Sequence, residues 1–170
     1  ANGTITAGGA LTASAITNTN GVITLNADGN SWNADQTLAG TVIYNGADQT
    51  IVGSKYTNLT LSGSGVKTAA GTLTVTDTFT NSVTLDAENV ALGTVSNTGT
   101  MQISGTAAWT SSSIGGTVVY DGAAQNVVAS TYNNLQLTGG DKTSTGTLTV
   151  TDKLTNSAVL DAENVALNNV

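Results

Sequence analysis

Residues 71–93 read GTLTVTDTFTNSVTLDAENVALG, and this stretch carries the clearest signal of how the chain folds. In its first half, apolar Leu73, Val75 and Phe79 alternate with threonines. This period of two is typical of a β-strand. The stretch returns at residues 146–168 as GTLTVTDKLTNSAVLDAENVALN. A repeat of about 75 residues at a fixed spacing indicates an array of stacked structural units.

The remaining sequence repeats as well. Residues 40–68 and 116–143 are two copies of one pattern, and a weaker copy of the first stretch, GTITAGGALTAS, begins at Gly3. We interpret residues 1–170 as a single repetitive β-solenoid. Its first repeat spans about residues 3–70, its second about 71–145, and a partial third about 146–170.

Two all-β architectures accommodate short strands at this spacing: a parallel β-solenoid, or β-helix, and tandem antiparallel β-sandwiches. The solenoid is favoured because the chain has no proline, which would interrupt a continuous ladder, and because its core candidates are mostly aliphatic. A coil of roughly 20 to 25 residues would give about three coils per repeat. Coils about 4.8 Å apart would then make a rod on the order of 35 Å long.

Composition excludes several functions. The net charge is −7, and the chain contains no histidine, cysteine or arginine. The side chains that most hydrolases, transferases and metal sites use are therefore missing, so we expect no enzyme and no cofactor. An acidic chain without arginine is a poor ligand for nucleic acid, and no apolar run is long enough to insert into a membrane.

The succession TVIYNGADQTIV, YTNLTLSGSGVKT, GTLTVTDTFTNS and LDAENVAL resembles the tandem β-strand repeats of exported bacterial surface proteins, the filamentous-haemagglutinin-like adhesins. The resemblance covers nearly the whole chain. It implies a parallel β-solenoid at the cell surface that serves as a stalk, filament or adhesin. The family supplies no catalytic residues that carry over to this sequence.

The carboxylates Asp86 and Glu88, with their copies Asp161 and Glu163, are spaced two apart and are candidates for calcium binding. One pair offers few ligands, and the nonapeptide pattern of calcium-binding solenoids is missing. Carboxylates in contact with solvent, at turns or strand edges, are the interpretation we favour.

The aromatic residues fall at equivalent places in the two repeats. A regular ladder of exposed rings would bind carbohydrate, whereas rings stacked inside the solenoid would serve packing. The sequence favours packing and leaves carbohydrate binding open as the alternative function. The candidates are Tyr44, Tyr56, Tyr120, Tyr132, Trp32 and Trp109.

Two further features have structural interpretations. Lys67 and Lys142 follow equivalent Gly/Ser turns, so we expect solubilising turn residues. The dense threonine row TVTDTFT occurs only once per sequence repeat, which disfavours a flat threonine surface present on every coil.

The two ends of the sequence lie within the repeat pattern, and no polar capping segment is recognisable. Val165, Leu167 and Val170 are therefore candidates for end-to-end stacking, and head-to-tail contacts that do not close generate filaments. The sequence predicts a non-enzymatic, extracellular structural protein, the shaft or subunit of a bacterial surface filament or adhesin. Its partners would be copies of itself or adjoining repeats, with host or matrix glycans as a further class.

Overall fold

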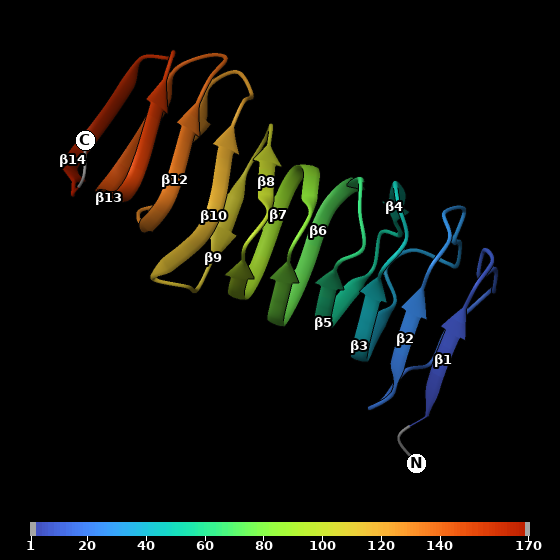
Figure 1. Cartoon of the computed structure of the whole chain (residues 1–170). Helices are drawn as coiled ribbons and strands as arrows, with labels where there is room; N and C mark the ends of the chain where they lie inside the picture. The colour runs from blue at the N-terminus through green and yellow to red at the C-terminus, as the bar shows by residue number, and fades with distance from the viewer. Residues whose placement is uncertain (1–2, 169–170) are drawn as a thin grey trace.

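The computed structural model describes residues 3–168, and every regular element in that range is a β-strand (Figure 1). The strands are β1 (Thr4–Ala7), β2 (Val22–Leu25), β3 (Thr37–Tyr44), β4 (Gln49–Ile51), β5 (Lys55–Leu61), β6 (Val66–Asn81), β7 (Thr84–Asn97), β8 (Thr100–Ile103), β9 (Ala107–Trp109), β10 (Ser113–Tyr120), β11 (Gln125–Asn126), β12 (Thr131–Leu137), β13 (Lys142–Asn156) and β14 (Leu160–Leu167).

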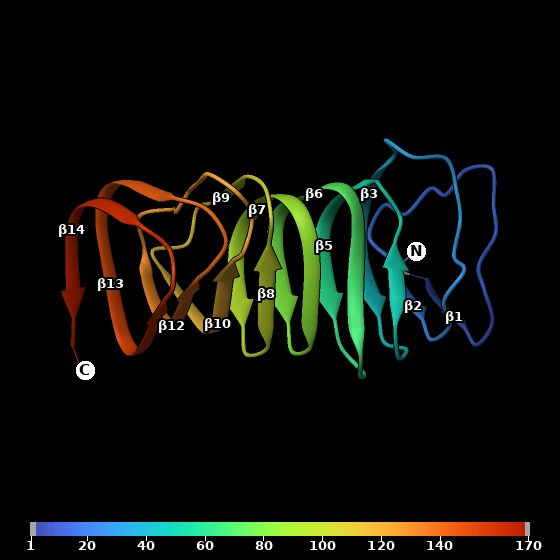
Figure 2. The same ribbon diagram turned by 90° about the horizontal axis from the view of Figure 1, so that it is seen from above.

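Each coil stacks on the one before it through parallel pairing. Thr4 pairs with Val22, and Val22 in turn pairs with Thr41, so the chain returns to the same side of the rod once per coil. The whole is a β-solenoid of about nine turns, with the two chain ends at opposite ends of the rod (Figure 2). The predicted parallel solenoid is confirmed. The antiparallel alternative is wrong, since every strand pair within residues 3–168 is parallel.

The coils are shorter than the sequence suggested. Asn58 in β5 lies opposite Thr78 in β6. The number of residues in this coil, which is a long one, only reaches the lower limit of the expected range. Thr84 lies opposite Thr100 across β7 and β8, and this short coil falls clearly below that range. Small Gly, Asn and Ser residues at the corners let the chain turn tightly. One sequence repeat therefore holds more than four coils instead of three.

A coil has three sides, which we call faces A, B and C. Strand β6 follows all three: residues 66–69 lie on face B, 72–75 on face C and 78–81 on face A. Its ladder with β7 shifts register between Ala69 and Thr72 and between Val75 and Thr78, which marks the corners. Face A comprises residues 4–7, 22–25, 41–44, 58–61, 78–81 and 94–97. Face B comprises residues 49–51, 66–69, 84–87, 100–103, 117–120, 134–137 and 153–156.

Face C comprises residues 37–38, 55–56, 72–75, 89–92 and 107–109, and it continues with 125–126, 142–144 and 160–162. In the second half of the rod, face A continues with residues 113–114, 131–132, 147–150 and 164–167. A hydrogen bond links the two halves of face A: the Asn97 side-chain amide donates to the Gly115 carbonyl at 2.8 Å.

The second sequence repeat is turned by one face relative to the first. Tyr44 lies on face A, whereas its sequence equivalent Tyr120 lies in register with Ile103 on face B. The chain between these two tyrosines makes four coils and one further face. In Figure 1 this appears as two rows of arrowheads, one containing β1, β2, β3 and β5 and the other containing β8, β10, β12 and β13.

Stacked aliphatic side chains form the core. On face A the inward positions of successive coils are Ile23, Val42, Leu59, Phe79 and Val95, paired in register and each at most 7% exposed. Burying one such side chain stabilises the fold by roughly 1.5–3 kcal/mol. A coil is therefore stable mainly because its neighbours cover it on both sides.

Candidate functional site

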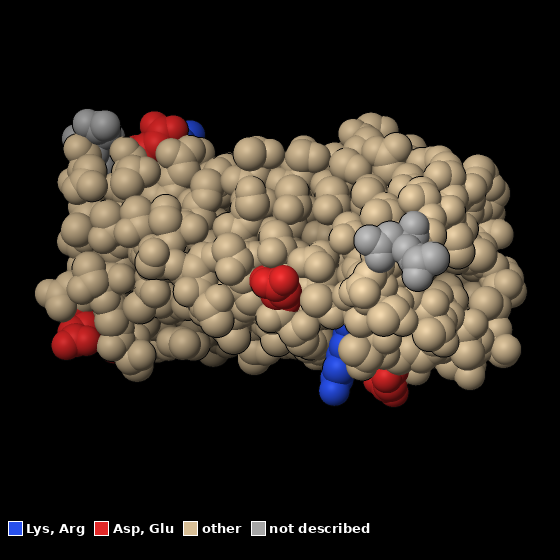
Figure 3. Space-filling view, turned by 90° about the horizontal axis from the view of Figure 1, so that it is seen from below, with Lys and Arg blue, Asp and Glu red and all other residues tan. Residues whose placement is uncertain are grey.

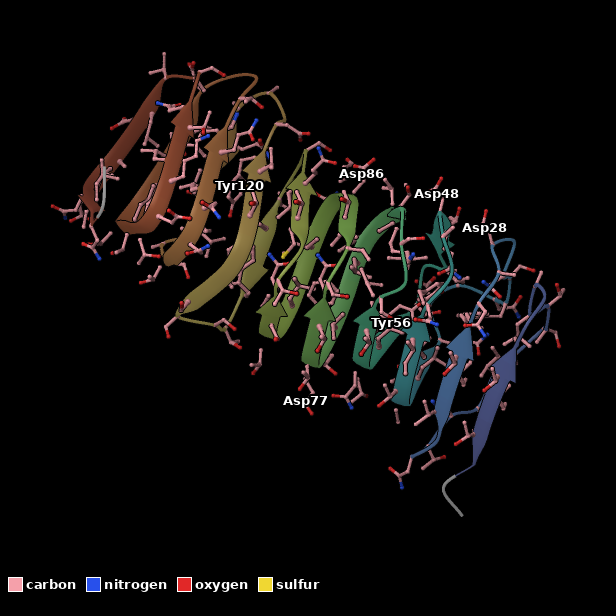
Figure 4. The ribbon with its side chains drawn as sticks, viewed as in Figure 1. Asp28, Asp48, Tyr56, Asp77, Asp86 and Tyr120 are labelled. Atoms are coloured by element: carbon pink, nitrogen blue, oxygen red, sulfur yellow. The ribbon has the colours of Figure 1, made fainter. Side chains whose placement is uncertain are left out.

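The four tyrosines lie inside the rod. Tyr44, Tyr56, Tyr120 and Tyr132 are each 0% exposed, and Figure 4 labels Tyr56 and Tyr120 within the coils. Stacking on a sugar requires an exposed ring face, and these rings present none. The repeat rotation also places equivalent tyrosines on different faces, so they form no continuous stripe. The structure thus favours the packing role that the sequence left beside carbohydrate binding.

Each tyrosine pair closes a hydrogen-bond ring with the backbone of one corner residue. The Val52 N–H donates to the Tyr44 hydroxyl at 3.0 Å, and the Tyr56 hydroxyl donates to the Val52 carbonyl at 2.5 Å. The two hydroxyls lie 3.2 Å apart. Because the Tyr56 proton is used on Val52, Tyr44 must be the donor to Tyr56. Tyr120 and Tyr132 form the same ring with Val128.

The two tryptophans differ in their surroundings. Trp32 is 7% exposed, and its indole N–H donates to the Ser54 hydroxyl at 2.9 Å. Trp109 is partly buried and packs edge to face against Tyr132, with ring centroids 6.2 Å apart. The indole N–H of Trp109 is buried and has no hydrogen-bond partner among residues 3–168.

The candidate carboxylates remain in water. Asp86, Glu88, Asp161 and Glu163 are all exposed, and Asp86 lies along one edge of the rod together with Asp28 and Asp48 (Figure 4). Asp86 belongs to face B and its copy Asp161 to face C, so the two pairs point to different sides. Within the described range, no three His, Cys, Asp or Glu side chains gather as a metal site would require. The space-filling view in Figure 3 shows a few scattered acidic and basic groups and no continuous charged patch on this side of the rod.

The expectation for the two lysines is wrong. Lys67 and Lys142 are 0% exposed and point into the solenoid. The Lys67 ammonium donates to the carbonyls of Gly46, Ala47 and Ser64, and burial lowers the pKa of Lys67 from its usual value. The Lys142 ammonium donates likewise to three backbone carbonyls within residues 122–140, and burial lowers the pKa of Lys142 as well. Both lysines therefore bind the coil corners instead of solubilising the surface.

Sequence reasoning missed a second set of buried polar side chains. The Gln49 amide bonds the Gly46 N–H and the carbonyls of Leu25 and Ala27, so it joins two coils. Gln125 makes the same three contacts in the second repeat. A signal was available, because both glutamines end the matched segments NGADQ and DGAAQ.

Threonine side chains gather on face A from unrelated parts of the sequence. The outward positions on successive coils include Thr4 and Thr6 in β1 and Thr78 and Thr80 in β6. The expectation of one dense row per repeat therefore understates how threonines line up across coils. The columns are interrupted, for example by Ile43.

Most of the exposed large apolar residues lie on the first and last described coils, and one further residue, Val66 at the start of β6, is 37% exposed in the middle of the rod. Val165 and Leu167 on β14 are each 44% exposed, Val159 is 67% exposed, and Ile5 on β1 is 52% exposed. In contrast, Ile23, the next inward residue after Ile5 on face A, is 3% exposed. Val170, the third predicted stacking residue, lies outside the described residues.

The LDAENVAL octapeptide occurs in two different settings. At residues 85–92 it is covered on both sides, by β6 and by β8 with β9. There its Val90 and Leu92 are 2% and 5% exposed. At residues 160–167 the same octapeptide pairs, among residues 3–168, only with β13, and its equivalents Val165 and Leu167 are each 44% exposed. The edge of β14 that faces away from β13 has no strand partner in the part of the chain that the structure describes, and we take it as the candidate interaction site.

The comparisons with known proteins add no identity. The chain matches no family model, no curated protein and no solved structure. Among residues 3–168 there is also no helix with the length and apolarity needed to cross a membrane.

Proposed function

We propose that this protein is a non-enzymatic structural rod, the shaft or a subunit of an extracellular bacterial filament or adhesin, which extends when copies stack end to end. The resemblance to exported β-strand repeats supports the location, and the lack of cysteine and histidine supports a role without catalysis. The single observation that carries the proposal is the pair of LDAENVAL copies, one covered by a further coil and one paired on one side only among the described residues.

A further coil could be placed on β14 at a low cost in free energy. In the covered copy Asp86 and Glu88 stay exposed although coils lie on both sides. A coil added to β14 would therefore bury Val165 and Leu167 and leave Asp161 and Glu163 in water. Stacking gains apolar burial, and these two carboxylates need not be desolvated.

Electron microscopy and sedimentation at rising protein concentration test the proposal. We expect rods that lengthen with concentration, and their loss in the variant Val165→Lys/Leu167→Lys, because two ammonium groups would be buried at the junction. The matched control is Thr60→Lys/Thr80→Lys, which adds the same charge on the outer side of face A in the middle of the rod. Rods of unchanged length in the first variant, or single particles at every concentration of the parent protein, would refute the proposal.

A further inference from the structure

We propose that the outer side of face A, in the first half of the rod, is a binding surface for ice. Six neighbouring strand segments build it, and each turns two side chains outward, so that two columns run along the rod. The first column is Thr4, Val22, Thr41, Asn58, Thr78 and Thr94, and the second is Thr6, Thr24, Ile43, Thr60, Thr80 and Ser96. We call these residues the threonine surface. The inference goes beyond the proposed function and does not require copies to stack.

The threonine surface is a lattice with two repeat distances. Its six segments pair in register, and the register shifts of the ladder lie at corners, as between Val75 and Thr78. Neighbouring outward side chains are therefore about 4.8 Å apart along the rod and about 6.6 Å apart along a strand. Oxygen atoms on the prism face of hexagonal ice repeat at a similar pair of distances, within about a tenth of each. A lattice that matches in both directions can hold a layer of water in the arrangement of the crystal.

The side chains of this lattice suit a surface of ordered water. A threonine carries a hydroxyl group, which donates and accepts hydrogen bonds, beside a methyl group. β-branched side chains are also stiff at χ1, so little conformational entropy is lost when ice binds. The interruptions keep part of this chemistry: Val22 and Ile43 keep a branched apolar side chain, and Ser96 keeps a hydroxyl group.

The threonine surface is also free of charge. None of its twelve residues is acidic or basic, whereas the outward positions of face B include Asp86 and Lys153. Figure 4 shows Asp77 along one edge of the rod and Asp28 and Asp48 along the opposite edge. Charged groups lose much free energy when their water shell is disturbed, so they would oppose contact with a neutral crystal. Face A therefore fits ice, and face B does not.

The sequence hides this surface because each segment comes from a different coil. The motif Thr-x-Thr is complete only at Thr4 with Thr6 and at Thr78 with Thr80. Coils of unequal length then bring Thr24, Thr41 and Thr60 into the same two columns. The lattice is thus a product of register and not of a short sequence repeat.

Freezing measurements on the purified protein test the inference. We expect the parent protein to keep ice grains small during annealing and to open a gap between the melting and freezing temperatures. Both effects should be lost in Thr60→Lys/Thr80→Lys, which places two ammonium groups in the second column. The matched control Thr84→Lys/Thr100→Lys adds the same charges on adjacent coils of face B and should keep both effects.

A milder variant keeps the test decisive if the lysine variant unfolds. Thr60→Ser/Thr80→Ser removes only two methyl groups from the threonine surface, and we expect it to fold and to bind ice more weakly than the parent protein. No effect on ice by the parent protein would overturn the inference. So would equal effects of the face A and face B lysine variants, or an unchanged effect of the serine variant.

The results also separate this inference from the proposed function. Thr60→Lys/Thr80→Lys should still form rods while it loses its effect on ice. Val165→Lys/Leu167→Lys, which should form no rods, leaves the threonine surface intact and should still bind ice as single particles. Rods without any effect on ice would overturn only the inference, and an effect on ice without rods would overturn only stacking.

Discussion

The hydroxyl groups of Tyr44 and Tyr56 lie 3.2 Å apart in the interior of the rod, and together they satisfy the N–H and the carbonyl of Val52. A buried peptide group without partners destabilises a fold by about 1–3 kcal/mol. The tyrosine pair therefore replaces, at this corner, the hydrogen bonds that a strand would receive from its neighbour.

Removing one hydroxyl should open this ring. In Tyr56→Phe the Val52 carbonyl loses its donor, and we expect a loss of about 1–3 kcal/mol in the free energy of unfolding, measured by denaturant titration. Tyr132→Phe should behave alike, since Tyr132 donates to Val128. Thr60→Val, on the outer side, serves as a control with a change within about 0.5 kcal/mol. A stability of Tyr56→Phe equal to that of the parent would contradict this role.

Tyrosine burial predicts alkaline unfolding. Burial raises the pKa of Tyr44 and of Tyr120 to about 12 and raises the pKa of Tyr56 and Tyr132 further. Since these folded-state values exceed the unfolded value of about 10, the stabilisation is complete below about pH 10 and is lost as the pH rises through the folded values. Near-ultraviolet absorbance should show the tyrosines ionising together with loss of β-structure by circular dichroism. Ionisation near pH 10 in the folded protein would refute the prediction.

The buried lysines should be sensitive to removal of charge. Lys67→Met leaves the carbonyls of Gly46, Ala47 and Ser64 without their shared donor, so we expect a lower unfolding free energy by at least about 1–3 kcal/mol. The matched substitution Lys55→Met, at an exposed position, should change little. Equal effects of the two substitutions would show that the Lys67 hydrogen bonds contribute nothing.

Lys67 also predicts a pH dependence. Burial lowers the pKa of Lys67, so between its folded and unfolded values the unfolded chain binds more protons. The contribution of Lys67 to stability should therefore rise as the pH increases through that window. The unfolding free energy of the parent should accordingly rise relative to that of Lys67→Met across the same window. Parallel curves for the two proteins would argue against a lowered lysine pKa.

Two glycines with positive φ separate backbone strain from steric contact. Gly63 has φ of 80°, and an added Cβ would lie 2.3 Å from the Asn45 carbonyl oxygen. Gly71 has φ of 87° and nothing within 4 Å of such a Cβ. Both alanine variants carry roughly 1–2 kcal/mol of left-handed strain. We expect Gly63→Ala to unfold at clearly lower denaturant than Gly71→Ala, and equal midpoints would show that the corner relaxes.

The fold class could be predicted from the sequence because the pattern that specifies it is local and is repeated along the chain. The alternation of Leu73, Val75 and Phe79 with threonine specifies strands, and the lack of proline permits an uninterrupted ladder. The inward location of Lys67 was not readable. A lysine after a Gly/Ser turn is usually solvated, and only the backbone carbonyls converging from neighbouring coils provide the alternative to water.

Residue order alone is enough to specify stacked strands, since the period of two and the long repeat that relates Gly71 to Gly146 are properties of the chain itself. Which strands become neighbours depends on the folded molecule. The corners set a different length for each coil, as the pairs Asn58 with Thr78 and Thr84 with Thr100 show. One sequence repeat therefore spans four coils and one further face, and the equivalent residues Tyr44 and Tyr120 lie on different sides of the rod. Alternation fixes which side chains point inward, whereas the position of a strand around the rod depends on the accumulated length of every corner before it.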